Sequence, residues 1–271
     1  MIPCLSEYTV VSAPRERFLQ GAEKAGFPAV ELSWRTVMAA IRNDDVGSLA
    51  RTVAAHNLKV ASINGPDLPN LPPEDDFRSV LLETDAVVSA AKTLGCSTLM
   101  PCAAPMKTDL SQDVAIDQTV TILQRMADAC GDDFRLAFEF VGLNSFSVKD
   151  LRTASQVIRR VGRKNVGILV DAFHMYLQNT PFSEVVELEK NKLFFVHLND
   201  AKSGPREGLN DGDRVYPGQG VMNLGELRSS LSKVGYEGYL CLELFNQEYW
   251  KDDPQAVAER GRRSITETFG V

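Results

Sequence analysis

The chain has 271 residues, a formal net charge of −7 and a pI near 5.1, so phosphate backbones and anionic membranes gain no charge attraction from it. Hydrophobic residues make up 44% and charged residues 24%, the composition of a globular protein with a sizeable core. We find no export signal and no apolar run of membrane-spanning length. The five cysteines lack C-x-x-C spacing, which argues against a disulfide framework and a cysteine-based zinc site. These features predict a cytoplasmic protein that binds neither nucleic acid nor membranes.

Apolar runs of strand length alternate with amphipathic stretches of helix length, which is typical of parallel β/α architecture. About 250 residues is usual for a (β/α)8 barrel, so we expect residues 1–271 to form a single TIM-barrel domain of the α/β class. The strands are predicted, in chain order, at Ile2–Glu7, Ala29–Ser33, Lys59–Asn64, Thr98–Cys102, Arg135–Phe140, Gly167–Asp171, Leu193–Asn199 and Gly238–Leu244. Helices are predicted between them, including Pro14–Ala25, Asp76–Leu94, Ser111–Cys130, Val148–Val161 and Asn223–Val234. Glycines near the helix ends are predicted to be C-caps with positive φ, namely Gly26, Gly95, Gly162 and Gly235.

The main alternative fold is an open doubly wound sheet, which usually places a glycine-rich phosphate loop after its first strand. The corresponding turn here reads EYTVVSAPRER and has no glycine. The chain also lacks a Walker-type loop, a G-x-S-x-G elbow and an H-E-x-x-H helix, so nucleotide, hydrolase-triad and zincin functions lose their usual motifs. A barrel with a non-nucleotide site is therefore the favoured interpretation.

Four late strands end in a polar residue after an apolar run, at Glu139, Asp171, His197 and Glu243. Functional residues of a barrel lie at the carboxyl ends of its strands, so we expect these four to converge. A single strand-end carboxylate is more simply an ion pair or a helix cap, but three that share one volume repel one another unless a cation is bound. Three carboxylates and one imidazole suit Mn²⁺, Co²⁺, Mg²⁺ or Zn²⁺ and leave coordination positions for two substrate oxygens. The sequence therefore predicts one divalent-metal site.

Three further residues are candidates for binding a substrate. His174 follows Asp171 by three positions, in DAFH, where the alternative is a capping or packing histidine. Arg214 lies in LNDGDRVYPGQG after the seventh strand and could bind hydroxyl groups through its guanidinium, although loop arginines are usually solvated. Trp34 follows the second strand and could form an apolar wall against a sugar ring, although packing beneath a loop is the commoner role of such aromatic residues.

The ordered motifs of the C-terminal half resemble the xylose-isomerase-like barrel superfamily of sugar isomerases and epimerases, and within it the inosose (2-keto-myo-inositol) isomerase branch. The resemblance rests on LAFEFVG, NVGILVDAFHMY, HLNDA, DGDRVYPGQGVMNL and LELFNQEYW, and more weakly on AEKAGFPAVELSW and AAKTLGCSTLMP in the N-terminal half. It implies that the metal ligands are Glu139, Asp171, His197 and Glu243, and that His174 and Arg214 contact substrate.

The reaction expected from this resemblance is isomerisation of a keto-polyol through a cis-enediolate, as part of inositol or other carbohydrate metabolism. Glu139 and Glu243 are the expected proton carriers, in an order that the sequence leaves open, and His174 is expected to act at the substrate oxygen. The family's ketose 3-epimerases tend to carry another acidic residue where this chain reads GLNSFS, and its 3-dehydroshikimate dehydratases often have Gln in place of His197. These two enzyme classes are the alternatives, with a polyol-binding scaffold as the alternative that is not an enzyme. The exact substrate, the metal and the oligomeric state stay open.

Overall fold

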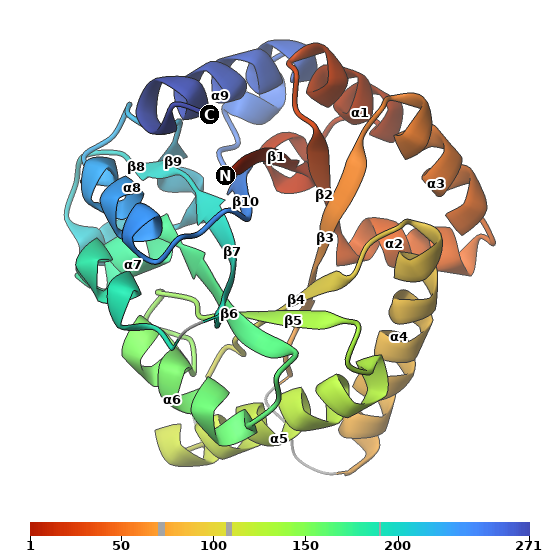
Figure 1. Ribbon diagram of the computed structural model, residues 1–271, viewed down its shortest axis with the longest axis vertical. Helices are drawn as coiled ribbons and strands as arrows, with labels where there is room; N and C mark the ends of the chain where they lie inside the picture. Colours follow the sequence, from red (N-terminus) through yellow and green to blue (C-terminus); the bar gives the residue numbers. More distant parts are fainter. Residues whose placement is uncertain (70–73, 107–109, 190) are drawn as a thin grey trace.

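The computed structural model describes residues 1–69, 74–106, 110–189 and 191–271. Eight parallel strands close into a barrel in the order β1-β10-β7-β6-β5-β4-β3-β2, which confirms the predicted (β/α)8 fold (Figure 1). The barrel strands are β1 (Ile2–Ser6), β2 (Ala29–Ser33), β3 (Lys59–Asp67), β4 (Thr98–Cys102), β5 (Arg135–Glu139), β6 (Val166–Asp171), β7 (Leu193–Leu198) and β10 (Tyr239–Leu242).

Most observed strand ends lie within two residues of the predicted ends, and β3 is the exception. It continues three residues beyond the predicted end, to Asp67, and its register with β4 shifts between Asn64 and Gly65. This shift keeps Asp67 paired with Cys102 at the end of β4.

The helices surround the barrel, and Figure 1 shows them as an outer ring. The four predicted C-cap glycines all have positive φ, between 64° and 77°. Several helices begin at a side chain that accepts a backbone N–H hydrogen bond, as Ser111 and Asp150 do. The helices are α1 (Arg15–Lys24), α2 (Trp34–Arg42), α3 (Val46–Ala55), α4 (Glu74–Thr93), α5 (Gln112–Cys130), α6 (Leu151–Val161), α7 (Ala172–Leu177), α8 (Leu224–Lys233) and α9 (Pro254–Phe269).

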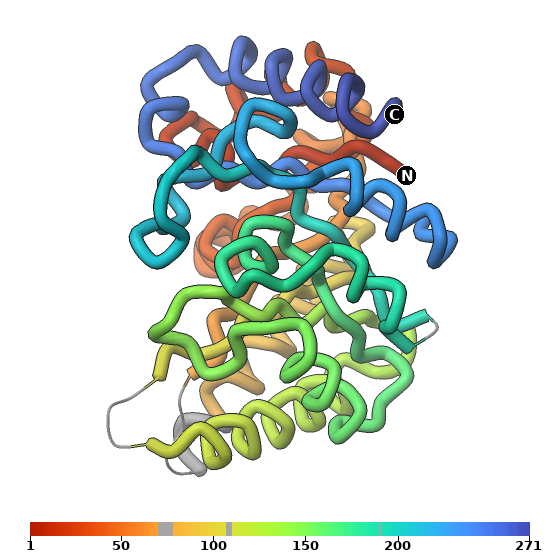
Figure 2. The backbone as a smooth tube through the Cα atoms, turned by 90° about the vertical axis from the view of Figure 1, so that its left-hand side faces the viewer, coloured from red at the N-terminus to blue at the C-terminus, as the bar shows by residue number. Residues whose placement is uncertain are grey.

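The two ends of the chain meet where the barrel closes. Strand β1 pairs with β10 on one side and β2 on the other, and α9 packs against α1. Figure 2 accordingly shows the N- and C-termini close together on one side of the molecule. In the described ranges, no helix is both long and apolar enough to cross a membrane.

The inside of the barrel contains a buried apolar layer to which each strand contributes one side chain. Its members are Cys4, Ala29, Ala61, Met100, Ala137, Leu169, Phe195 and Cys241. Side chains two positions apart on a strand point to the same face, so the residues two positions further along seven of these strands also face the barrel interior. Those residues are buried, and apart from Cys102 they are polar: Ser6, Glu31, Cys102, Glu139, Asp171, His197 and Glu243. The barrel therefore places a polar layer directly on top of an apolar one, at the carboxyl ends of the strands.

Candidate metal centre

The four residues predicted as metal ligands lie together at the centre of this polar layer. Each offers one ligand atom, and these atoms all lie within 4.8 Å of one another. The Nδ1 atom of His197 is 3.1 Å from Glu139 Oε1, 3.2 Å from Glu243 Oε2 and 3.8 Å from Asp171 Oδ2. All four side chains are buried, so the cluster is shielded from bulk water on the barrel side.

The local structure around Asp171 decides how its two carboxylate oxygens are used. Asp171 ends β6 and is the N-cap of α7, where its Oδ1 accepts a hydrogen bond from the backbone N–H of His174 at 3.0 Å. Its Oδ2 instead accepts from Asn199 Nδ2 at 3.1 Å and from Arg214 Nη1 at 2.8 Å. The cap therefore leaves Oδ2 for the cluster.

Arg214 is one of the largest fully buried side chains among the described residues, with only 1% of its surface exposed. Its Nη1 donates to Asp171 Oδ2 and to Glu243 Oε2, both at 2.8 Å, and its Nη2 donates to Asp211 Oδ1 at 2.8 Å. The guanidinium also lies 5.2 Å from the ring centres of Phe173 and Phe245. Arg214 is thus a buried counter-ion of two cluster carboxylates, whereas a loop arginine is ordinarily solvated.

A short hairpin after β7 holds Arg214 in this place. Strands β8 (Asp200–Ala201) and β9 (Arg214–Val215) pair in antiparallel fashion, and Ala201 lies opposite Arg214. The carboxylate of Asp200 accepts hydrogen bonds from the backbone N–H groups of Gly218, Gly220 and Met222, which fixes the turn after β9. A Cβ on Gly220 would lie only 2.3 Å from the Ala201 carbonyl oxygen, so this turn requires glycine.

His174 lies on α7 beside Arg214, with its Nε2 at 3.3 Å from Arg214 Nη2. A guanidinium can only donate, so Nε2 is the acceptor and the proton of a neutral imidazole is on Nδ1. That Nδ1 has no hydrogen-bond partner in the part of the chain that the structure describes. His174 therefore has a free donor for a bound molecule.

A cavity of about 270 Å³ opens over the cluster at the carboxyl ends of the strands. Tyr8 and Phe245 stack with ring centres 4.8 Å apart and contribute an aromatic wall to it. Trp34 begins α2 and packs against the backbone of Gly65, outside the set of described residues that line this cavity, so its role in substrate binding stays a prediction. The lining consists of Tyr8, Arg35, Asn64, Asp67, Cys102, Glu139, Val141, Phe146, His174, Asp211, Arg214, Glu243 and Phe245.

Burial and charged neighbours shift the pKa values of the cluster. Burial raises the pKa of Glu243 to about 7, against the opposing charges of His197 and Arg214. Burial also acts to raise the pKa of Asp171, but the charge of Arg214 and smaller contributions from two histidines lower it to about 2. For His197, burial acts to lower the pKa, yet the surrounding carboxylates raise it well above its ordinary value. The cluster thus favours a positive charge at its centre.

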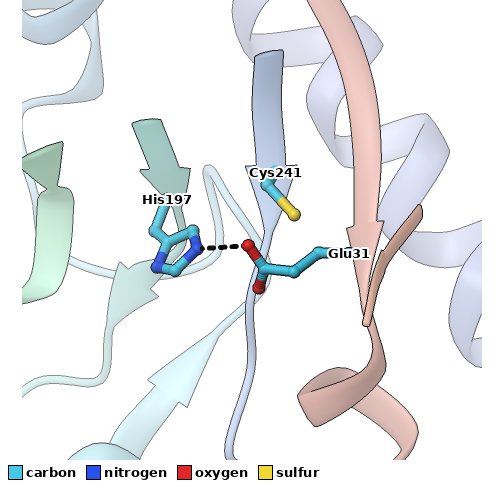
Figure 3. A group of neighbouring side chains, drawn as sticks. All are labelled: Glu31, His197 and Cys241. Carbon is cyan, nitrogen blue, oxygen red and sulfur yellow. Dashed lines mark hydrogen bonds and ion pairs between the residues drawn. The ribbon is translucent and has the colours of Figure 1, made fainter. Parts of the chain in front are cut away.

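Besides Asn199, which donates to Asp171, three residues that contact the cluster were not identified from the sequence. Asn64 donates to Glu243 Oε1 at 2.9 Å, and the Cys102 thiol donates to Glu139 Oε2 at 3.1 Å. Glu31 is fully buried and its Oε2 is 3.0 Å from His197 Nε2 (Figure 3). The sequence does contain a signal for Glu31, because it is a charged residue inside the buried and otherwise mostly apolar strand AVELS.

The donor set and the charge balance fit a divalent cation. Four buried carboxylates, those of Glu31, Glu139, Asp171 and Glu243, lie within 4 Å of a His197 ring nitrogen. With His197 neutral, as a metal ligand must be, the four negative charges of these carboxylates exceed the single positive charge of the Arg214 guanidinium by three. A divalent cation would reduce this excess to one, and carboxylates with one imidazole suit Zn²⁺, Mn²⁺ or Co²⁺. The described residues can therefore hold one such ion.

The chain is similar to known proteins both in sequence and in fold. The chain is 27% identical over 255 residues to an inosose isomerase of Bacillus velezensis, and the alignment covers 92% of this chain and 90% of that protein. It is 29% identical over 182 residues to a 3-dehydroshikimate dehydratase of Pseudomonas putida, and this alignment covers 60% of this chain and 28% of that protein. A solved structure described as IOLI protein with a binding zinc atom superposes with a TM-score of 0.91 at 23% identity, covering 100% of this chain and 98% of the other.

The family model described as xylose isomerase-like TIM barrel matches residues 19–268, which is most of the chain. This match confirms the resemblance seen in the sequence motifs and agrees with the closed eight-stranded barrel. The chain belongs to the xylose isomerase-like TIM barrel family.

Proposed function

We propose that the protein is a divalent-metal-dependent isomerase of a cyclic polyol ketone of the inosose type. The observation that carries this proposal is the convergence of the four ligands Glu139, Asp171, His197 and Glu243. Glu139 and Glu243 line one cavity together with the Arg214–His174 pair. The similarity to an inosose isomerase over 92% of the chain supports the choice of reaction.

The chemistry follows from the acidity of a C–H group next to a carbonyl. A divalent cation held by the four ligands would supply positive charge that stabilises the negative charge developing on substrate oxygens. Glu139 and Glu243 come from separate strands and both line the cavity, so one carboxylate can take the proton from the hydroxyl-bearing carbon. The substrate becomes a cis-enediolate, and a proton delivered to the former carbonyl carbon exchanges the positions of ketone and hydroxyl.

Arg214 and His174 are suited to binding and moving protons at the substrate oxygens. The free Nδ1–H of His174 can donate to a carbonyl oxygen and take part in moving the hydroxyl proton between the two oxygens. Arg214 balances the negative charge of Asp171 and Glu243 through its two 2.8 Å contacts, and it lines the cavity beside His174. The stacked rings of Tyr8 and Phe245 offer an apolar wall to the C–H face of a ring, while the polar groups face its hydroxyl edge.

A deuterium-exchange screen tests the proposal. The purified protein, loaded with Zn²⁺, Mn²⁺ or Co²⁺, is incubated in D₂O with inososes, ketohexoses and 3-dehydroshikimate and followed by NMR. We expect deuterium at the carbon next to the inosose carbonyl and a second inosose isomer, and we expect both to be lost in Glu139→Gln and Glu243→Gln. Exchange on ketohexoses alone would favour epimerisation, and polyol binding without any exchange would favour a scaffold.

One observation favours a dehydratase as the second candidate. Arg35 lies exposed at the cavity and forms no ion pair with an acidic side chain among the described residues, so it could bind a carboxylate on the substrate. 3-Dehydroshikimate carries such a carboxylate, and the relative from Pseudomonas putida is a 3-dehydroshikimate dehydratase. Loss of the β-hydroxyl would give a conjugated product, so ultraviolet absorbance separates this reaction from isomerisation. Arg35→Ala would weaken it selectively.

A further inference from the structure

Glu31 is a buried carboxylate whose two oxygens are fully engaged by the barrel. Its Oε2 accepts from the Ser62 hydroxyl at 2.9 Å and lies 3.0 Å from His197 Nε2, and its Oε1 accepts from Asn64 Nδ2 at 3.1 Å. The side chain has no exposed surface, and a charge buried this deeply is costly unless donors compensate it. Three donors from two other strands meet this need.

The contact with Glu31 determines which ring nitrogen of His197 carries the proton. Nδ1 faces Glu139, Asp171 and Glu243, and a nitrogen that binds a metal must offer its lone pair. A neutral imidazole then has its proton on Nε2, and Nε2 points at Glu31 Oε2, which can only accept. Glu31 therefore selects the tautomer that leaves Nδ1 free for the cluster.

Asn64 extends this control to a second ligand. Its Nδ2 has two protons, and it donates one to Glu31 Oε1 and the other to Glu243 Oε1 at 2.9 Å. Because Oε1 of Glu243 is engaged in this way, Oε2 is the oxygen that lies 3.2 Å from His197 Nδ1 in the cluster. One network on β2 and β3 thus orients an imidazole and a carboxylate that come from β7 and from the end of β10.

We propose that Glu31, acting through His197 and Asn64, is a positioning residue for metal binding. It holds the proton on Nε2 of His197 and, through Asn64, the orientation of the Glu243 carboxylate, so that Nδ1 of His197 and Oε2 of Glu243 are the atoms that face an arriving ion. This inference rests on the metal site of the proposed function and does not depend on which substrate is used.

The same neighbourhood allows another interpretation, a second metal site made of Glu31, His197 and Cys241, whose ligand atoms also lie within 4.8 Å of one another. Two observations argue against it. Both oxygens of Glu31 already accept hydrogen bonds, and Cys241 belongs to the apolar layer inside the barrel. In Figure 3 the Cys241 sulfur lies beside Glu31, while the marked contact joins His197 and Glu31. We therefore assign Glu31 to His197 and treat a second ion as an outcome of the test.

The test measures metal affinity and the histidine tautomer directly. Wild type, Glu31→Gln and the control Cys241→Ala are titrated with Zn²⁺ in competition with a chromophoric chelator, and their ¹⁵N-labelled histidine side chains are observed by NMR. We expect one Zn²⁺ per chain in all three proteins, with binding about 10–100-fold weaker in Glu31→Gln. In metal-free protein, at a pH high enough for His197 to be neutral, the Nε2–H signature of His197 should be present in wild type and Cys241→Ala and lost or mixed in Glu31→Gln. A merely structural role would not change this signature.

Asn64→Ala is the second variant, which keeps the proposal testable if Glu31→Gln does not fold. It removes the link to Glu243 and should weaken Zn²⁺ binding about tenfold while the His197 tautomer is retained. The proposal is overturned if Glu31→Gln binds Zn²⁺ as tightly as wild type with an unchanged tautomer, or if wild type binds two ions and Cys241→Ala one. Wild type without any Zn²⁺ affinity would overturn it as well. Normal Zn²⁺ binding without isomerase turnover would contradict the proposed function alone.

Discussion

Replacing Arg214 by methionine should destabilise the metal-free protein and at the same time strengthen metal binding. The methionine side chain would keep much of the apolar volume between Phe173 and Phe245 but lose the two 2.8 Å contacts to Asp171 Oδ2 and Glu243 Oε2. Removing one partner of a buried ion pair costs about 3–5 kcal/mol, because the other charge is left buried without compensation. We expect a loss of this size in the free energy of unfolding of metal-free Arg214→Met.

The expected gain in metal affinity follows from the oxygens that Arg214 uses. Asp171 Oδ2 and Glu243 Oε2 are also the oxygens by which these two residues face His197 Nδ1, at 3.8 and 3.2 Å, so the guanidinium and a metal ion would share them. A bound cation would compensate those carboxylates in the variant, so the loss of stability should be smaller in the loaded protein. By linkage the difference appears as tighter binding, about tenfold for each 1.4 kcal/mol.

The assay combines urea unfolding, with and without Zn²⁺, with competitive Zn²⁺ titration at about pH 8.5, where proton competition at Glu243 is small because its pKa is about 7. Arg214→Lys is the matched control, because it keeps the positive charge and should therefore show no gain in affinity. Weaker Zn²⁺ binding in Arg214→Met would refute the reasoning, since it would mean that Arg214 holds the carboxylates ready for the metal rather than competing with it.

Three further predictions concern protons, turnover and the hairpin. The pKa of Glu243 is raised to about 7 and that of His197 lies well above its ordinary value, so the metal-free protein should lose stability as the pH rises through about 7. Bound Zn²⁺ should reverse this loss of stability. Thermal unfolding at about pH 6 and pH 8.5, with chelator or with Zn²⁺, measures both effects. Glu243→Gln should lower turnover of an exchanging substrate by about 10²–10⁴-fold or more, and near-normal turnover with metal bound would contradict its role. Gly220→Ala should lower the free energy of unfolding by about 1–3 kcal/mol and should also lower turnover, because the clash with Ala201 displaces the hairpin that carries Arg214. Unchanged turnover would show that the hairpin accommodates the added methyl group without moving Arg214.

The barrel and the strand-end cluster were predictable because their signals are local. In four late strands an apolar run ends in a polar residue, and the period of two along a strand tells which face that residue occupies. Glu139, Asp171 and His197 are each two positions beyond a member of the apolar layer, namely Ala137, Leu169 and Phe195. No information about the partner strands is needed to make this inference.

The burial of Arg214 and the role of Glu31 depend instead on contacts between distant segments. Arg214 is buried because β9 pairs with β8 and Asp200 fixes the following turn, and neither pairing has a signal in the residues around Arg214. Glu31 meets Ser62 because the β2–β3 register shifts after Val30. A register shift is set by packing in the closed barrel, so a single sequence does not reveal it.

The two stacked layers of the barrel also determine from which side the site can be reached. Below the cluster, the apolar layer excludes water and offers no polar partner to the carboxylates, and burial is the largest cause of the raised pKa of Glu243. Above it, the cavity is lined by Asp67, Asp211 and Arg35 at its polar edge. An ion or substrate therefore reaches the ligands from the cavity side, where these charges lie. Substitution of Asp67 and Asp211 should change the rate of metal entry, while substitution of Glu31, within the polar layer, should change the affinity for the metal.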